Sequence, residues 1–256
     1  MPKIVFITGA TSGFGKASAY KFAAHGYDLI LNGRRTDRLQ TLADELENKY
    51  NVAVLQLPFD VQIQKDVFES INSIPEKWMT IDVLVNNAGL ALGRDYFEEG
   101  SLEDWNTMID TNVKGFVYVA KAVSQLMAKR KQGHIINMGS VAGKEVYEKG
   151  NIYCATKFAV DAISKGMRID MLRHNIKVTA INPGAAETEF SIVRFKGDEG
   201  TAKSIYNGIK PLTAEDVADV IFYCASLPEH VCINDLTISC TRQANAIYFN
   251  REQPVD

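Results

Sequence analysis

The sequence is poor in the residues that would build a metal site or a disulfide framework. Only four of its 256 residues are cysteines, and none of these forms a C-x-x-C pair. The lack of such pairs argues against a zinc site, and the few cysteines give little sign of a disulfide framework. The four histidines are scattered, and none has two other potential ligands nearby in the sequence. We therefore expect reduced thiols and no bound metal.

Long apolar runs and a strong charge of one sign are also missing. No apolar run approaches the roughly 20 residues of a membrane span. The formal net charge of −3 offers no basic field for nucleic acid or an anionic membrane. The first residues lead directly into an apolar segment, without the layout of a signal peptide. These features predict a cytoplasmic protein with no nucleic-acid or membrane partner.

What the chain does have is a regular alternation of short apolar runs with longer segments of helical period. Apolar residues make up 46% and charged residues 23% of the chain, which suits one globular domain. The segment 36–50 has the apolar stripe of an amphipathic helix, with Thr36 or Asp37 as its N-cap. Strands are expected at residues 3–8, 27–32, 52–57, 81–85, 133–138, 177–181 and 236–239.

Repeated strand–helix–strand units need crossover connections, which produce a parallel sheet covered by helices on both faces. We predict an α/β fold: a single-domain, doubly wound parallel sheet of the Rossmann-like type, with about seven strands over residues 1–256. A weakly patterned stretch from Gly184 to Gly200 predicts a lid segment near residues 184–210. In such sheets ligands bind beyond the carboxyl ends of the strands.

A glycine-rich loop follows the first predicted strand. Its spacing, G-x-x-x-G-x-G, precedes a helix expected from about Lys16. Glycines allow a tight turn and a close approach of backbone to a pyrophosphate at the helix N-terminus. The motif alone is a modest signal, but its place between strand and helix favours a dinucleotide site over an ordinary turn. The loop residues assigned to this site are Gly9, Thr11, Ser12, Gly13, Phe14 and Gly15.

Two arginines follow the second predicted strand. Arg34 and Arg35 stand where an NAD-binding site usually offers a carboxylate to the ribose 2′-hydroxyl. Guanidinium groups would instead hold the 2′-phosphate of NADP, which a carboxylate would repel. The alternative is a pair of solvated surface arginines, but the position favours the phosphate. We predict NADP as the cofactor.

A tyrosine and a lysine form the candidate catalytic pair. Tyr153 and Lys157 stand at i and i+4, adjacent on one helix face. A phenol is a poor base at neutral pH, and lowering its pKa by about 3 would need about 4 kcal/mol of phenolate stabilisation. The ammonium and an oxidised nicotinamide could together supply this, so that the phenol exchanges a proton with the substrate as hydride moves.

The spacing of this pair is weak by itself, because Tyr206 and Lys210 repeat it. We interpret that second pair as an ordinary helix surface, since no serine follows a strand just before it. Ser140 comes directly after the fifth predicted strand, where ligands are expected. Its hydroxyl could hydrogen-bond the substrate oxygen as charge develops there.

With these pieces together, the chain resembles the short-chain dehydrogenase/reductase family over essentially its whole length. The ordered set of motifs is far more specific than any of its members. These motifs are the glycine loop, Asp60-Val61, Asn86-Asn87-Ala88-Gly89, Asn112, Ser140, Tyr153 with Lys157, and Pro183-Gly184 followed by Thr188. The resemblance implies an oxidoreductase that acts on alcohol or carbonyl groups.

The resemblance also implies roles that spacing does not assign. Asn112 would hold a helix kink and a water in a proton relay to Lys157, which would also bind the nicotinamide ribose. The other implied cofactor contacts fall in three groups: Asp60 and Val61 at the adenine, Asn86, Asn87, Ala88 and Gly89 on the adenosine side, and Pro183, Gly184 and Thr188 along the nicotinamide.

A closer resemblance, to the NADP-dependent 3-hydroxy acid dehydrogenases, rests on residues 86–93, 188–190 and 193–198. That group acts on serine, allo-threonine and related acids, and its members are usually homotetramers. We therefore expect hydride transfer between NADP(H) and the 3-hydroxyl or 3-oxo group of short hydroxy acids. Arg194 or Lys196 could bind the substrate carboxylate when the lid closes, or both could be solvated loop charges.

Two other functions stay open. A broad-specificity NADPH-dependent carbonyl reductase would use the same residues, and only substrate profiling separates it. A non-catalytic NADP-binding regulator would be expected to break the set of Ser140, Tyr153 and Lys157, which is complete. The tail contains Ile247-Tyr248-Phe249, so we expect it to pack on its own domain or on a partner subunit.

Overall fold

The computed structural model describes residues 2–252. Within that range the chain forms a seven-stranded sheet in the order β3-β2-β1-β4-β5-β6-β7, with every neighbouring pair parallel. Its strands are β1 (Ile4–Ile7), β2 (Asp28–Asn32), β3 (Val54–Leu57), β4 (Ile81–Asn86), β5 (Gly133–Met138), β6 (Ile176–Pro183) and β7 (Asp235–Ile238). The strand order reverses between β1 and β4, as in a doubly wound sheet. The predicted α/β fold is confirmed.

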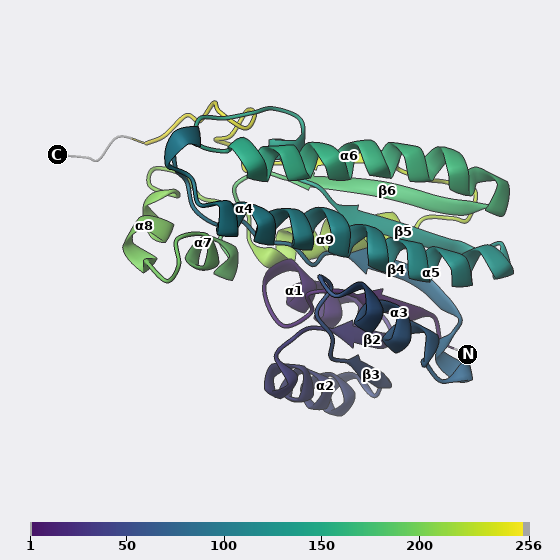
Figure 1. The fold of residues 1–256 in the computed structure, drawn as a ribbon. Helices are drawn as coiled ribbons and strands as arrows, with labels where there is room; N and C mark the ends of the chain where they lie inside the picture. The colour runs from purple at the N-terminus through teal and green to yellow at the C-terminus, as the bar shows by residue number, and fades with distance from the viewer. Residues whose placement is uncertain (1, 253–256) are drawn as a thin grey trace.

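Helices cover both faces of the sheet (Figure 1). One layer holds α1 (Gly13–Ala23), α2 (Thr36–Tyr50) and α9 (Ala214–Ser226), and the other holds α3 (Gln64–Asn72), α5 (Phe116–Arg130) and α6 (Asn151–Met171). Alternate residues of β1 enter opposite layers: Val5 and Ile7 the first, Ile4 and Phe6 the second. Because both faces are buried, the strand reads as a continuous apolar run.

Two local predictions are wrong. The helix after the glycine loop begins at Gly13 rather than near Lys16. The second helix, α2, begins at Thr36 and has Arg35 at its N-cap position. Because Arg35 has the extended backbone of an N-cap, Thr36 and Asp37 already lie inside the helix, and no side chain caps this end.

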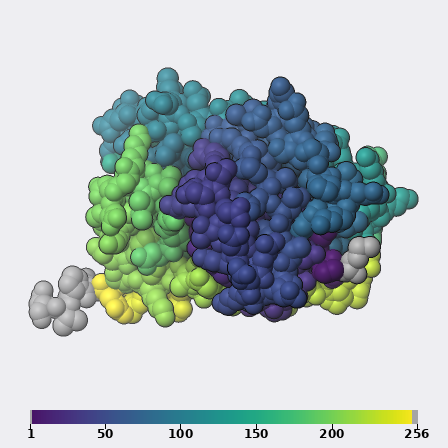
Figure 2. All heavy atoms as spheres, turned by 90° about the horizontal axis from the view of Figure 1, so that it is seen from below, coloured from purple at the N-terminus to yellow at the C-terminus, as the bar shows by residue number. Residues whose placement is uncertain are grey.

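The segment predicted as a lid contains two short helices. The side chain of Thr188 caps α7 (Glu189–Arg194), and that of Asp198 caps α8 (Glu199–Ser204). Local caps rather than a long apolar stripe define these helices, which explains the weak sequence pattern. Figure 2 shows this segment, in green, beside the N-terminal part of the chain in purple and blue.

Three findings concern membranes, metals and thiols. In the range 2–252, none of the helices is both long and apolar enough to cross a membrane. Within the same range, no group of three His, Cys, Asp or Glu side chains is placed to hold a metal ion. The four cysteines are free, and three of them are buried.

Candidate active site

A cavity of about 760 Å³ lies beyond the carboxyl ends of strands β1 to β6. Gly9 after β1 and Asn87 after β4 face it where the strand order reverses. Most residues predicted for the site line this cavity: Gly9, Thr11, Ser12, Gly13, Phe14, Arg34, Arg35, Asp60, Val61, Asn87, Ala88, Gly89, Ser140, Tyr153, Lys157, Pro183, Gly184, Thr188 and Arg194. Gly15, Asn86 and Asn112 do not line it. Gly15 and Asn112 instead contact residues that do: Gly9 and Asn87 for Gly15, and Leu90 for Asn112.

The glycine loop is packed too tightly for larger residues. Gly9 and Gly13 have positive φ angles of 64° and 49°, a region that glycine adopts most easily. A Cβ atom on Gly15 would lie 2.3 Å from the carbonyl oxygen of Gly9. Backbone can therefore approach a pyrophosphate here without side chains in between, so the loop fits a dinucleotide.

Asn87 and Thr8 tie the glycine loop to the end of β4. The Asn87 side chain donates to the carbonyl oxygen of Thr8 at 2.9 Å and to that of Gly9 at 3.4 Å. The Thr8 hydroxyl accepts hydrogen bonds from the backbone N–H groups of Asn87 and Ala88, each at 2.9 Å. Asn86 instead donates from its buried side chain to the carbonyl oxygen of Phe116, 3.0 Å away, and so anchors α5.

Three arginines surround the end of β2, one more than the sequence analysis assigned. Arg34 pairs with Asp60 at 3.3 Å. Arg35 donates to the Thr11 hydroxyl at 2.9 Å and to Glu189 at 3.4 Å, and Arg38 donates to Glu189 at 3.1 Å. Arg38 stands three residues after Arg35 in the first turn of α2, and that spacing was the signal available in the sequence.

The candidate catalytic pair lies on α6 and is almost fully buried. Tyr153 and Lys157 are each 8% exposed, and the lysine Nζ lies 6.0 Å from the centroid of the tyrosine ring. Nζ also donates to the carbonyl oxygen of Met138 at 2.9 Å. The Ser140 hydroxyl accepts from the backbone N–H of Ala142 at 3.1 Å and faces the same cavity.

Burial dominates the protonation of this pair. It raises the pKa of Tyr153 above its usual value, with a smaller contribution from Tyr147, while Ser140 and Arg194 act in the opposite direction. Burial also lowers the pKa of Lys157 to about 8. The ammonium alone therefore does not make this phenol acidic. A second positive charge, such as that of an oxidised nicotinamide, would act with the ammonium to lower the pKa of the phenol.

Asn112 lies in a π-helical turn, η3 (Asp110–Gly115), between α4 (Leu102–Ile109) and α5. Its buried side chain donates to the carbonyl oxygen of Leu90 at 2.7 Å and accepts from the Leu90 N–H at 2.8 Å. It also donates to the Thr156 hydroxyl at 3.1 Å, which links the turn to α6 beside Lys157.

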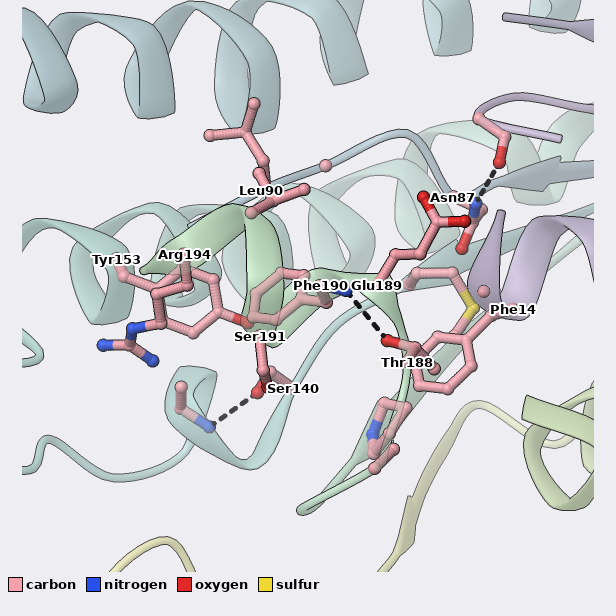
Figure 3. Close-up of a pocket in the computed structure, with 18 of the residues that line it drawn as sticks. Phe14, Asn87, Leu90, Ser140, Tyr153, Thr188, Glu189, Phe190, Ser191 and Arg194 are labelled. Carbon is pink, nitrogen blue, oxygen red and sulfur yellow. Dashed lines mark hydrogen bonds between the residues drawn. The ribbon is translucent and has the colours of Figure 1, made fainter. Parts of the chain in front are cut away.

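The structure separates the two predicted carboxylate ligands. Arg194 is 8% exposed, and its guanidinium carbon lies 5.4 Å from the centroid of the Tyr153 ring (Figure 3). It donates to the carbonyl oxygen of Gly93 at 3.2 Å and to the Tyr147 hydroxyl at 3.0 Å. Lys196 instead pairs with Asp104 at 2.8 Å, and its side chain is 62% exposed. Only Arg194 therefore faces the cavity.

The interpretation of Tyr206 as a helix surface is wrong. Helix α8 ends at Ser204, and Tyr206 turns back toward α7 and lines the cavity. Its hydroxyl donates to the carbonyl oxygen of Ala186 at 2.7 Å and lies 2.6 Å from the Ser191 hydroxyl.

The C-terminal segment also lines the cavity, a contribution that sequence reasoning missed. Gln243 is buried, and its side-chain oxygen accepts from the Ala185 N–H at 2.7 Å. A Cβ atom on Gly184 would lie 2.2 Å from that same oxygen. Ile247 and Phe249 line the cavity as well. Of the two predicted alternatives for the tail, this part packs on its own chain.

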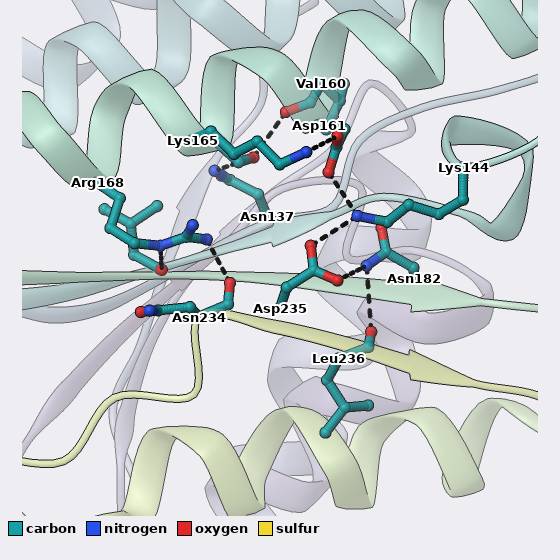
Figure 4. Close-up of polar contacts among 12 residues, drawn as sticks. Asn137, Lys144, Val160, Asp161, Lys165, Arg168, Asn182, Asn234, Asp235 and Leu236 are labelled. Atoms are coloured by element: carbon teal, nitrogen blue, oxygen red, sulfur yellow. Dashed lines mark hydrogen bonds and ion pairs between the residues drawn. The ribbon is translucent and has the colours of Figure 1, made fainter.

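A polar network behind the site holds the loop after Ser140 in place. Lys144 follows the 3-10 turn η4 (Val141–Gly143) and contacts Asp161 of α6 at 2.6 Å and Asp235 of β7 at 2.7 Å. Lys165 holds the second oxygen of Asp161 at 2.6 Å. Figure 4 shows Lys144 between the two carboxylates. The network connects the loop after Ser140 (the serine loop), helix α6 and the last strand, β7.

Comparisons with known proteins agree with this geometry. The short chain dehydrogenase family model matches residues 3–198. NADP-dependent 3-hydroxy acid dehydrogenase YdfG of Escherichia coli (strain K12) is 46% identical over 244 residues, which cover 95% of this chain and 97% of that protein. Sulfoacetaldehyde reductase 2 of Chromohalobacter salexigens is 46% identical over 245 residues, which cover 95% and 96%.

A solved structure extends this likeness to three dimensions. The closed form of a serine dehydrogenase complexed with NADP+ superposes with a TM-score of 0.90 at 45% sequence identity, and the match covers 98% of this chain and 100% of that one. The resemblance stated from the motifs is confirmed. The chain belongs to the short chain dehydrogenase family.

Proposed function

We propose that this chain is an NADP-dependent oxidoreductase that oxidises the 3-hydroxyl group of short 3-hydroxy acids such as serine or allo-threonine, and reduces the 3-oxo group in the reverse direction. The observation that carries this substrate class is the buried Arg194 guanidinium beside the Tyr153 ring. The relatives named 3-hydroxy acid dehydrogenase and serine dehydrogenase support the same choice.

The cavity fits NADP in its shape and charge. Bare backbone at Gly9 and Gly13 suits the pyrophosphate, and Arg34 and Arg35 suit the 2′-phosphate. Asp60 and Val61 line the part of the cavity assigned to the adenine, and Asn87, Ala88 and Gly89 the adenosine side. Pro183, Gly184 and Thr188 line the part assigned to the nicotinamide. When bound, NADP+ takes up the hydride that leaves the substrate carbon.

Residues of α6 and of the loop that contains Ser140 carry out proton transfer. In oxidation Tyr153 accepts the proton of the substrate hydroxyl, and in reduction it donates the proton back. Ser140 hydrogen-bonds the substrate oxygen and holds it near the phenol. Lys157 stabilises the phenolate and binds the nicotinamide ribose. Asn112 holds α6 beside Lys157 through its hydrogen bond to Thr156. By the family resemblance, it would also hold a water in the proton relay.

Arg194 sets the preference for an anionic substrate. Among the described residues, none of the carboxylates lies within ion-pair distance of this guanidinium. A buried charge without an acidic partner is costly, and a substrate carboxylate would repay part of that cost. A carboxylate held there would place the neighbouring hydroxyl carbons of a short acid against Tyr153.

A second candidate is the reduction of short aldehydes that carry an anionic group. A relative named sulfoacetaldehyde reductase 2 is as identical to this chain as the hydroxy acid dehydrogenase. A sulfonate would accept hydrogen bonds from Arg194 as a carboxylate does. In a broad carbonyl reductase without preference for anions, the buried guanidinium would keep only its contacts with Gly93 and Tyr147.

Spectrophotometric assays at the nicotinamide absorbance test the proposal. L-serine and L-allo-threonine with NADP+ should give turnover, while the same acids with NAD+ should react far more slowly. Sulfoacetaldehyde with NADPH tests the second candidate, and a neutral aldehyde of the same length tests the broad reductase. If the protein turned over none of the 3-hydroxy acids, the proposed substrate class would be refuted.

We also propose that the enzyme is cytoplasmic and forms a homo-oligomer, a tetramer by family resemblance. Each subunit would be one catalytic domain with a lid near residues 184–210. Four free thiols suit a reducing compartment. Ile169 and Leu172 on and after α6 are more than three-quarters exposed, which suits a subunit contact. Light scattering after gel filtration measures the number of subunits, and a monomer would contradict this part.

A further inference from the structure

The lid helix α7 joins two distant parts of the cavity. Its first residue, Glu189, lies at the arginines that follow β2, and its last, Arg194, lies against Tyr153. Phe190, next to Glu189, packs edge-on against Tyr153 with ring centroids 5.7 Å apart (Figure 3). A helix of this length is only about 9 Å long. A displacement at one end is therefore transmitted to the other.

Two guanidinium groups hold the Glu189 carboxylate. Arg38 donates to both of its oxygens at 3.1 Å, and Arg35 donates to one of them at 3.4 Å. Arg35 also donates to the Thr11 hydroxyl of the glycine loop at 2.9 Å. Glu189 thus connects the lid to α2 and, through Arg35, to the loop that fits the pyrophosphate.

Arg35 is one of the two arginines assigned to the coenzyme 2′-phosphate, so the inference rests on that part of the proposed function. A phosphate monoester carries a charge of about −1.5 to −2 near neutral pH and has three acceptor oxygens. Glu189 and the phosphate repel each other when both lie on one arginine pair. The phosphate has the larger charge and more acceptors, so it displaces the carboxylate. Arg34 pairs with Asp60, so Arg35 is the arginine for which the phosphate and Glu189 compete directly.

We propose that Glu189 is a specificity-determining residue that acts as a charge gate for the coenzyme. Its carboxylate occupies Arg35 and Arg38 until a 2′-phosphate takes its place, and the displacement moves α7 together with Phe190 and Arg194. A dinucleotide that lacks the 2′-phosphate leaves Glu189 on the arginines. Binding of the phosphorylated coenzyme is thereby coupled to the arrangement of the groups around Tyr153.

Equilibrium binding without turnover tests the gate. The variant Glu189→Gln keeps the size of the side chain and removes its charge. Its Kd for NADPH, measured by fluorescence titration of the full chain, should fall by about twofold to fivefold, the effect of one exposed charge. Its Kd for NADH should not fall. The variant should also bind adenosine 2′,5′-bisphosphate more tightly, as it binds NADPH. Its Kd for adenosine 5′-monophosphate should stay unchanged, as for NADH.

Glu187→Gln is the matched control, because Glu187 is an exposed acid two residues away in the same segment. It should leave all four dissociation constants unchanged. Glu189→Ala is the second variant, and a thermal melt of each protein shows that it is folded. The gate is overturned if both Glu189 variants bind NADPH no more tightly than the natural chain, or if Glu187→Gln tightens NADPH binding equally.

Two further measurements separate the gate from the assignment on which it depends. Arg35→Ala should weaken binding of NADPH and leave that of NADH unchanged. Unchanged NADPH binding in this variant would overturn the assignment of Arg35 to the 2′-phosphate. Loss of NADPH binding in Arg35→Ala, with no tightening in Glu189→Gln, would overturn only the gate. Hydrogen exchange over residues 189–206 should respond to adenosine 2′,5′-bisphosphate but not to the monophosphate, and equal responses would overturn the coupling.

Discussion

The guanidinium carbon of Arg194 lies 5.4 Å from the centroid of the Tyr153 ring, and both side chains are 8% exposed. The cation reaches this position from the last residue of α7, while the phenol comes from α6. An anion held by the guanidinium would therefore lie within a few ångströms of the group that exchanges a proton with the substrate. This relationship makes the charge of the substrate a testable property of the site.

Replacing Arg194 by methionine should discriminate between charged and neutral substrates. A charge-assisted hydrogen bond contributes about 1.5–3 kcal/mol, so kcat/KM for L-serine or L-allo-threonine should fall by about 10- to 100-fold. The value for a neutral alcohol or aldehyde should change much less. Lys196→Met is the control, since it removes a cation of the same segment that does not face the cavity. Equal losses on charged and neutral substrates would assign Arg194 a structural role only.

Tyr153→Phe should separate proton transfer from coenzyme binding. The change removes the hydroxyl but keeps the ring that packs against Phe190. Turnover should fall by about 100- to 10,000-fold, the usual contribution of a general acid or base. The Kd for NADPH should change little, because the variant keeps the ring and its packing against Phe190. Substantial remaining turnover would show that another group transfers the proton.

The parts of this protein that sequence analysis predicted are those with a local pattern. Continuous apolar runs marked the strands because both faces of the sheet are buried, as Val5 and Phe6 show. Tyr153 and Lys157 could be paired because they stand four positions apart on one helix. The glycine loop could be placed because backbone geometry, rather than a distant partner, requires glycine at Gly9 and Gly13.

The parts that were missed depend on contacts between residues far apart in the chain. Arg38 and Glu189 are separated by 151 positions, and nothing near either residue indicates the other. Gln243 reaches the cavity only because the tail returns to Ala185, 58 positions earlier. The effect of burial on the pKa of Tyr153 was missed for the same reason, since it depends on the assembled cavity and not on Lys157 alone.

The pH dependence of folding should report the burial of Lys157. Burial lowers its pKa to about 8 in the folded chain, while the unfolded chain has a lysine pKa near 10.4. Between these values the unfolded chain binds more protons than the folded one, so stability rises with pH in this window. Below about pH 8 the lysine is charged in both states, and the full cost of burying the charge is present.

Comparison with Lys157→Met isolates this effect, because other titrating groups are common to both proteins. The natural chain should gain up to about 3 kcal/mol of unfolding free energy relative to the variant between pH 8 and pH 10.4. Urea unfolding at several pH values measures the difference. A difference that does not change with pH would show that the lysine keeps its ordinary pKa in the folded chain.

The last prediction concerns the carboxylate between Lys144 and Lys165. Burial alone would raise the pKa of Asp161, but its hydrogen bonds to the two lysines outweigh burial and hold the pKa below its usual value. Because the carboxylate pKa is lower in the folded chain, the ionised group stabilises the fold at pH values above its unfolded-state pKa of about 3.9. This contribution is lost as the pH falls through the lower pKa of the folded chain. The contribution should therefore be complete at neutral pH and disappear in acid.

Asp161→Asn should lower the unfolding free energy by about 1–3 kcal/mol at pH 7, because two lysines lose a partner whose side chain is only 11% exposed. The difference from the natural chain should shrink as the pH falls below about 4. Asp170→Asn is the matched control, an exposed acid on the same helix, and should change stability by less than about 0.5 kcal/mol. If Asp161→Asn behaved like this control at pH 7, the network would not hold the serine loop against α6, because it would contribute nothing to the fold that contains both.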